Sequence, residues 1–76
     1  MKSVTIKLNS INDVKQFVNI VSKYDFDVDL VSGRYIIDAK SIMGIFSLDL
    51  ANPIELEARG NEVDPLIDEL EPFLVK

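Results

Sequence analysis

The sequence has 76 residues, 47% of them hydrophobic, with thirteen acidic and eight basic residues, a net charge of -5, and no cysteine or histidine. This length corresponds to a single domain, residues 1–76, and the acidic balance disfavours nucleic acid and membranes as partners, because both select for basic patches. Any metal would have to be held by carboxylates alone, so we expect neither a metal nor a cofactor. The sequence lacks a signal-peptide pattern and an apolar run of about 20 residues, so we expect a cytoplasmic protein.

The chain begins with a strand and a helix. Apolar and polar residues alternate over residues 4–8, which is typical of a half-buried strand. Ser10 precedes Asp13 by three residues and forms a candidate capping pair at a helix start. Apolar residues then recur at spacings of three and four, which predicts an amphipathic helix over residues 11–23. Its apolar stripe comprises Ile11, Val14, Phe17, Val18 and Val21.

A hairpin and a short helix follow. Acidic and apolar residues alternate over residues 25–30, so one face of this strand is expected to be buried and the other hydrated. Gly33 can adopt the positive φ angle of a tight turn, and residues 34–39 form the predicted return strand. Residues 41–48 are predicted to form a short helix with Ser41 as its N-cap.

The last third of the chain predicts one more strand and one more helix. Alternation over residues 54–59 indicates the fourth strand. Asp64 and Pro65 are a favourable helix start, with the aspartate as the cap and the proline in the first turn. Pro72 conflicts with a continuous helix, because proline inside a helix removes one hydrogen bond at a cost of ~3 kcal/mol, so we expect a kink or a change of helix type just before it.

The predicted order is β-α-β-β-α-β-α. Strands with one hydrated face and helices with one apolar stripe predict an α+β fold, a two-layer open-faced sandwich whose four-stranded antiparallel sheet is covered on one side by three helices. The residues expected to be mostly buried are Val4, Ile6, Phe17, Val18, Val21, Val28, Leu30, Ile45, Phe46, Leu56, Leu66 and Leu70.

Three segments carry a resemblance to a known family. They are Ser22-Lys23-Tyr24-Asp25, the Ser32-Gly33 hairpin, and Lys40-Ser41-Ile42-Met43-Gly44 continued by Ser47-Leu48. Together they resemble HPr, the small phosphocarrier of the bacterial sugar phosphotransferase system, and the last segment is similar to the regulatory serine signature of HPr from Gram-positive bacteria. The resemblance covers about residues 22–73 and implies the fold order given above.

The chain departs from that family before Ser22. The family carries Gly-Ile-His-Ala-Arg-Pro-Ala between its first strand and first helix, and its histidine accepts a phosphoryl group. Counting back without a gap places Ser10 at the histidine position and Asn12 at the arginine position, and the loop is shorter by about three residues. Ser10 would give a stable phosphate ester and has no base to activate it, so we expect no catalytic residue and no phosphate relay.

The remaining functional candidates lie on the short helix. The resemblance implies phosphorylation at Ser41 and protein docking around it, and we assign Lys40, Ile42, Met43 and Phe46 as partner-binding residues. The apolar arc of this helix covers about 220°, twice what a core-facing helix needs, so Met43 and Ile42 should be exposed, whereas Ile45 and Phe46 should face the core.

The sequence therefore favours a non-enzymatic, HPr-like regulatory or adaptor protein. By resemblance, its partners are an HPr kinase/phosphorylase and a catabolite-control transcription regulator. The alternative is a degenerate paralogue, or an oligomeric small-molecule-sensing module without phosphorylation, and the oligomeric state stays open. Association through the open sheet face would be favoured if Tyr35 and Ile37 faced solvent, whereas exposure of Arg34, Ile36 and Asp38 would give a hydrated sheet.

Overall fold

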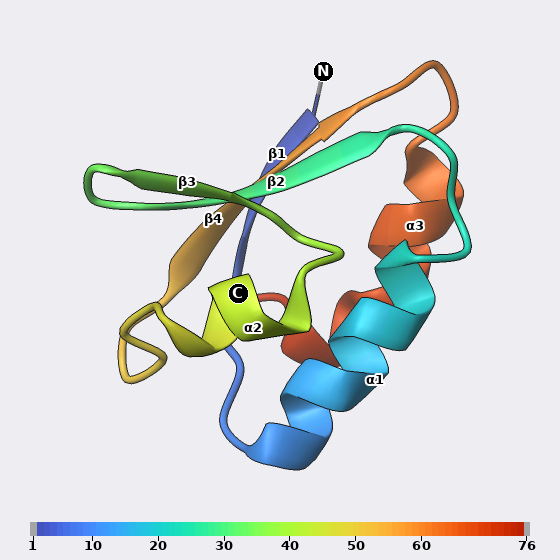
Figure 1. Cartoon of the computed structure of the whole chain (residues 1–76). Helices are drawn as coiled ribbons and strands as arrows, with labels where there is room; N and C mark the ends of the chain where they lie inside the picture. Colours follow the sequence, from blue (N-terminus) through green and yellow to red (C-terminus); the bar gives the residue numbers. More distant parts are fainter. Residues whose placement is uncertain (1, 76) are drawn as a thin grey trace.

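Strands and helices alternate along the chain in the predicted order (Figure 1). The structure, a computed structural model, describes residues 2–75. The elements are β1 (Lys2–Ile6), α1 (Ile11–Val21), β2 (Asp27–Ser32), β3 (Tyr35–Asp38), α2 (Ile42–Phe46), β4 (Ile54–Arg59), α3 (Asp64–Glu69) and a 3₁₀ turn, η1 (Glu71–Phe73). The predicted α+β fold class is confirmed.

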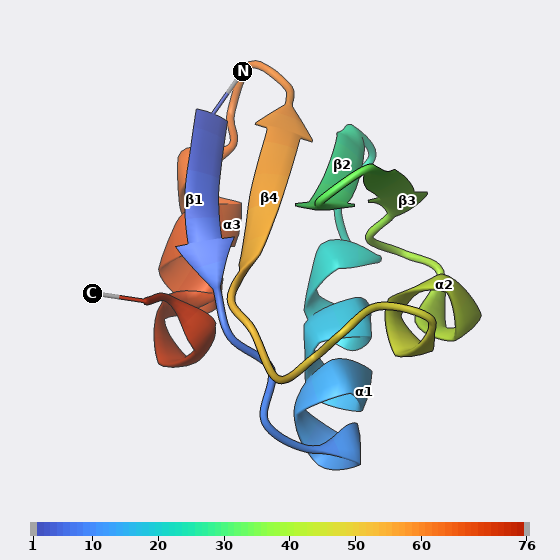
Figure 2. The same ribbon diagram turned by 90° about the vertical axis from the view of Figure 1, so that its left-hand side faces the viewer.

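The four strands form one sheet in the order β1-β4-β2-β3, and every neighbouring pair is antiparallel. Figures 1 and 2 show that the helices lie on one side of the sheet and leave the other side open. The register aligns Val4 with Leu56 and Leu56 with Leu30. Because side chains of aligned residues share a face, this register gathers the apolar residues on the side that the helices cover.

The core lies between the sheet and the helices. Nine of the twelve residues expected there are buried, Val4 and Val18 are half-buried against the same cluster, and Phe46 is exposed. Phe17 of α1 meets Phe73 of η1 edge to face, with ring centroids 6.4 Å apart. The 3₁₀ turn therefore contributes a buried aromatic side chain to the core.

The ends of several elements differ from the prediction. The first strand is Lys2–Ile6 instead of residues 4–8, α1 ends at Val21, and α2 at Phe46. Periodicity detects the faces of an element, whereas its ends depend on where backbone pairing stops. None of the helices in residues 2–75 has the length and apolar composition of a membrane span.

The start of the last helix differs from the prediction, whereas its end agrees with it. Asp64 is not the cap: it is the first helical residue, Val63 takes the cap position without a side-chain bond, and the Asp64 carboxylate pairs with Lys2 at 3.1 Å. The change of helix type before Pro72 is confirmed, since α3 ends at Glu69 and Pro72 lies in η1.

Candidate functional site

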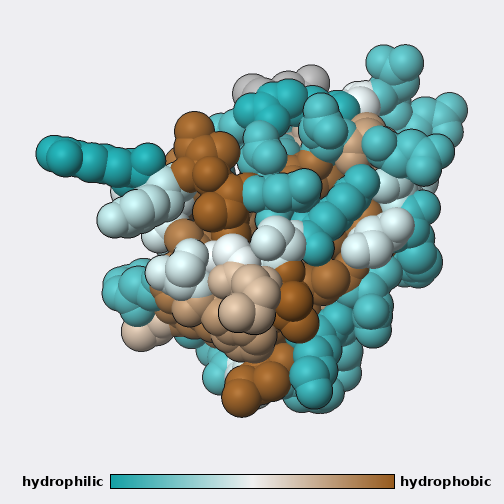
Figure 3. All heavy atoms as spheres, viewed as in Figure 1, coloured by the Kyte–Doolittle hydropathy of each residue, from teal (hydrophilic) through white to brown (hydrophobic). Residues whose placement is uncertain are grey.

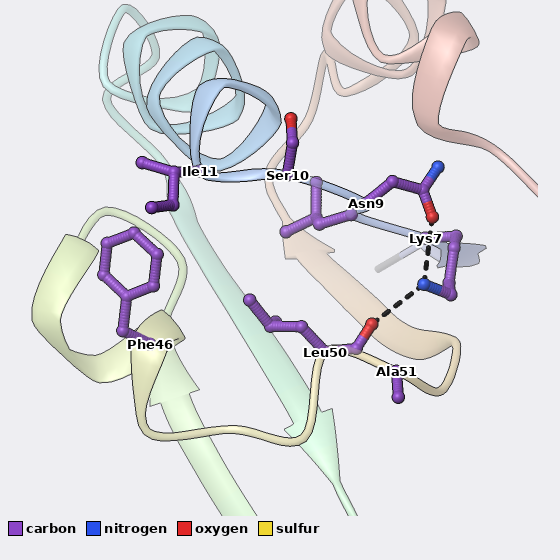
Figure 4. Close-up of a pocket in the computed structure, with 8 residues that line it drawn as sticks. Lys7, Asn9, Ser10, Ile11, Phe46, Leu50 and Ala51 are labelled. Atoms are coloured by element: carbon purple, nitrogen blue, oxygen red, sulfur yellow. Dashed lines mark hydrogen bonds between the residues drawn. The ribbon is translucent and has the colours of Figure 1, made fainter.

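A shallow pocket of about 440 Å³ opens where the loop after β1 approaches the end of α2. Figure 4 shows its walls, which come from three stretches of chain: the β1–α1 loop, the last residue of α2, and the loop that leads to β4. The pocket includes Ser10, which the resemblance to HPr places at the position of the family's histidine. The lining residues are Lys7, Leu8, Asn9, Ser10, Ile11, Phe46, Leu50 and Ala51.

The polar part of the pocket is built around Lys7. Its ammonium donates to the side-chain oxygen of Asn9 at 3.0 Å and to the backbone carbonyl of Leu50 at 2.9 Å. These bonds tie the β1–α1 loop to the loop after α2. The Lys7 ammonium therefore already has two hydrogen-bond partners within the pocket.

Ser10 serves as a helix cap. Its hydroxyl accepts a hydrogen bond from the backbone N–H of Asp13 at 3.1 Å, and the Asp13 carboxylate accepts one from the backbone N–H of Asn9 at 3.0 Å. In Figure 4 the Ser10 hydroxyl is directed away from Lys7. The predicted capping pair is confirmed, and each member of the pair satisfies a backbone donor at the start of α1.

Ile11 and Phe46 are the most exposed large apolar residues that line the pocket. Their side chains lie opposite one another in Figure 4, and they are 64% and 41% exposed. Two expectations are corrected here: Ile11 does not join the buried stripe of α1, and Phe46 does not enter the core. Ile11 is the first residue of its helix, whereas α2 is so short that Ile45 and Leu48 already fill the space above the core.

The outer side of α2 continues this apolar surface. Met43 is 77% exposed, as expected, whereas Ile42 is half-buried and packs against the core. Figure 3 shows hydrophobic atoms gathered over the β2–β3 hairpin, α2 and the start of α1, while hydrophilic atoms cover the side formed by α1 and α3. We define the α2 surface as Ile11, Ile42, Met43 and Phe46.

Ser41 caps α2 at the edge of this surface. Its hydroxyl accepts a hydrogen bond from the backbone N–H of Gly44 at 3.2 Å, and the residue is exposed. A side chain on Gly44 would place its Cβ 3.1 Å from that hydroxyl oxygen and 3.4 Å from Cδ1 of Ile37. Gly44 therefore allows both the cap and the close packing of α2 on β3.

Lys40 is bound to the backbone of a neighbouring segment and is not an exposed surface residue. Its ammonium donates to the backbone carbonyls of Tyr24 at 2.7 Å and of Phe26 at 3.2 Å, and its side chain is half-buried. These bonds connect the start of α2 to the segment between α1 and β2. Of the four partner-binding residues predicted from the sequence, Met43 and Phe46 are the two that the structure leaves exposed.

Comparison with known proteins identifies the family. Residues 11–76 match the family described as the phosphorylation site of the phosphotransferase-system HPr component, so the match begins one residue after Ser10. A comparison with curated proteins found no match.

Solved structures agree with this assignment. HPr-C-His from Thermoanaerobacter tengcongensis is 30% identical, with a TM-score of 0.82 over 95% of this chain and 89% of that one. HPr from Bacillus anthracis is 23% identical, with a TM-score of 0.72 over 97% of this chain and 94% of that one. The Bacillus subtilis protein Crh is 22% identical, with a TM-score of 0.66 over 93% of this chain and 88% of that one. Its structure is that of a swapped, intertwined dimer. The chain therefore belongs to the HPr family, whose members are phosphocarriers.

Proposed function

We propose that this chain is a cytoplasmic, non-enzymatic docking protein of the HPr family that does not relay phosphate. The proposal rests on a contrast between the missing histidine and the exposed apolar residues of α2. The sequence contains no histidine to accept a phosphoryl group, yet Phe46 is exposed in the pocket that Ser10 also lines, and Met43 is exposed on the same helix.

The chemistry of the loop after β1 supports the first half of the proposal. Ser10 takes the histidine position when residues are counted back from Ser22 without a gap, and its oxygen accepts the Asp13 N–H in the first turn of α1. A serine nucleophile needs an adjacent base, and the Lys7 amine, which also lines the pocket, already donates to Asn9 and Leu50. A phosphoserine formed there would be a stable ester instead of a phosphoimidazole that transfers its group onward.

The exposed apolar residues support the second half. Isolated apolar side chains on a surface are ordinary, but three members of the α2 surface, Ile11, Met43 and Phe46, are exposed in a domain of only 76 residues, and two of them, Ile11 and Phe46, line the pocket. Methionine suits such a surface, because its flexible, polarizable side chain adapts to different partners. By family resemblance, we propose an HPr kinase/phosphorylase and a catabolite-control transcription regulator as the partners.

We also propose that phosphorylation of Ser41 regulates docking. A phosphate on this residue would lie next to Met43, so its charge would border the apolar contact directly. It would add about -1.5 to -2 charge and three acceptor oxygens at the first turn of α2, where the Gly44 N–H already donates to the Ser41 hydroxyl. The modification would therefore change the surface that a partner meets while leaving the cap satisfied.

Substitution of Met43 by aspartate tests the docking proposal. An exposed substitution usually changes stability by less than about 0.5 kcal/mol, so the variant should fold normally. It should bind the purified kinase/phosphorylase or regulator at least about tenfold more weakly, because the new carboxylate would be desolvated without a partner.

Val75→Asp is the matched control, because Val75 is another exposed apolar residue that lies away from the α2 surface. Isothermal titration of both purified partners should show wild-type affinity for this control. Equal affinities of the wild type and Met43→Asp would remove α2 as the docking surface.

A further inference from the structure

The two outer edges of the sheet, at β1 and at β3, differ in their backbone pairing. The C-terminal segment covers the last part of the outer edge of β1, where Lys7 N–H donates to the carbonyl of Phe73 at 2.8 Å and Val75 N–H donates to the carbonyl of Thr5 at 3.0 Å. The opposite edge is β3, and within residues 2–75 no strand pairs with its outer side (Figure 2). An uncovered edge strand is a template for pairing with another strand.

The register fixes which backbone groups of β3 point outward. Ala39 N–H donates to the carbonyl of Val28 at 2.9 Å, so this pair is a hydrogen-bonded one. Hydrogen-bonded pairs alternate along an antiparallel ladder, so Ile37 and Tyr35 also bond to β2, opposite Leu30 and Ser32. The N–H and C=O groups of Ile36 therefore face away from the sheet.

The side chains along this edge are apolar in the middle and oppositely charged at the ends. Tyr35 is 70% exposed and Ile36 is 66% exposed. Arg34 precedes them and Asp38 follows Ile37, and both charged residues are exposed. Since Ile36 and Asp38 also face solvent, the open face of the sheet is hydrated, and the edge of β3 is a better association surface than that face.

We propose that β3 pairs antiparallel with β3 of a second copy of this chain, centred on Ile36. The sequence Arg34-Tyr35-Ile36-Ile37-Asp38 is self-complementary in this register. Ile36 meets Ile36 of the second copy and donates and accepts the central pair of backbone hydrogen bonds. Each Arg34 lies opposite Asp38 of the other copy, and each Tyr35 lies opposite Ile37.

This association is weak, for two reasons. A strand of four residues buries much less than the roughly 1,200–2,000 Å² of a standard interface. Two copies with a net charge of -5 also repel one another, although the paired edges are themselves neutral. The dimer should therefore be concentration-dependent and should be favoured by salt, which screens the overall repulsion more than the directly opposed pairs.

Charge exchange tests the register. Arg34→Glu places a glutamate opposite each Asp38, and Asp38→Arg places an arginine opposite each Arg34, so each variant alone should dimerise at least about tenfold more weakly than the wild type. An equimolar mixture of the two variants restores both opposite-charge pairs and should form a heterodimer. Sedimentation velocity over a wide concentration range measures all three samples.

Lys15→Glu is the matched control, because it makes the same charge change on the exposed face of α1 and should dimerise like the wild type. Asp38→Arg also removes the bond that the Asp38 carboxylate accepts from Lys40 N–H, so a thermal melt must show that this variant folds. Should it fail to fold, Ile36→Pro, which removes the outward N–H, takes its place and should be monomeric.

Three results overturn the proposal. The first is a wild-type chain that stays monomeric at every concentration. The second is a dimer that Arg34→Glu leaves intact, since this would place the interface elsewhere, for example at exchanged β1 strands. The third is a mixture of folded charge variants that forms no heterodimer.

Discussion

The hydroxyl oxygen of Ser41 has two roles in our proposal, as a helix cap and as a phosphorylation site. As an unmodified residue it caps α2 by accepting the Gly44 N–H. As a phosphoserine it would keep acceptor oxygens at the same helix end, so the fold would not need to change. Ser47, at the opposite end of α2, does not cap the start of the helix. Its hydroxyl donates to the carbonyl of Gly44 at 2.5 Å.

Phosphorylation should therefore be confined to Ser41. Incubation with HPr kinase/phosphorylase and ATP should add the mass of one phosphate to the wild type and to Ser47→Ala, and none to Ser41→Ala, as read by intact-mass spectrometry. Melting curves of the modified and unmodified chains should be nearly superimposable. An unmodified wild-type chain under conditions that phosphorylate a histidine-containing HPr would remove Ser41 regulation from the account.

The same residues show what the sequence could predict at this scale. Ser10 and Ser41 were predicted as caps because a serine before an apolar periodic segment has a local signature. Phe46 and Ile11 were misplaced, since helical periodicity gives a direction but not the distance over which the sheet extends beneath a helix. Lys40 could not be predicted as an anchor, because its carbonyl partners are 16 and 14 residues away.

At the scale of elements, three side chains join the end of α1 to α3. The Glu69 carboxylate accepts from the Lys23 ammonium at 2.5 Å and from the Tyr24 hydroxyl. The Lys23 bond, and then the Tyr24 bond, hold the pKa of Glu69 below its ordinary value. The bond to Glu69 raises the pKa of the Tyr24 hydroxyl, so this group stays protonated and continues to donate at neutral pH.

This junction should make stability depend on pH. A carboxyl whose folded-state pKa is lowered contributes stability above its ordinary pKa and loses that contribution as the pH falls through the lowered value. Glu69→Gln should therefore melt a few degrees below the wild type at pH 7, a small effect because the groups are solvent-exposed. The difference should shrink as the pH falls below the ordinary glutamate range.

Calorimetric melts from pH 7 to pH 3 measure this effect, with Glu62→Gln as the control on an exposed residue outside the junction. A difference between the wild type and Glu69→Gln that stays constant across this range would show that the charge of Glu69 does not stabilise the junction.

The order of elements was predictable because each strand and helix carries its own apolar period. Their ends were less predictable, since pairing between distant segments decides them: Ser32 joins β2 because it lies opposite Tyr35. Pro72 was an exception, because proline acts locally and ends the regular helix whatever its tertiary neighbours.

At the scale of the whole molecule, the chain has the sheet and helices of the HPr family, and its sequence contains no histidine. Residues 11–76 match the HPr family, and the residues before them provide a cap and a lysine bound to neighbouring oxygens. In this chain Met43 and Phe46 are exposed on α2. We therefore propose a separation of docking from phosphate relay.

The most direct test of that separation is incubation with phosphoenolpyruvate and the general phosphotransferase enzyme, with a histidine-containing HPr as the positive control. Intact mass measured at neutral pH should show one added phosphate on the control and none on this chain, because the sequence offers no imidazole. An acid-labile, base-stable phosphate on this chain would contradict the account, since it would show that the chain carries phosphate by a residue other than histidine.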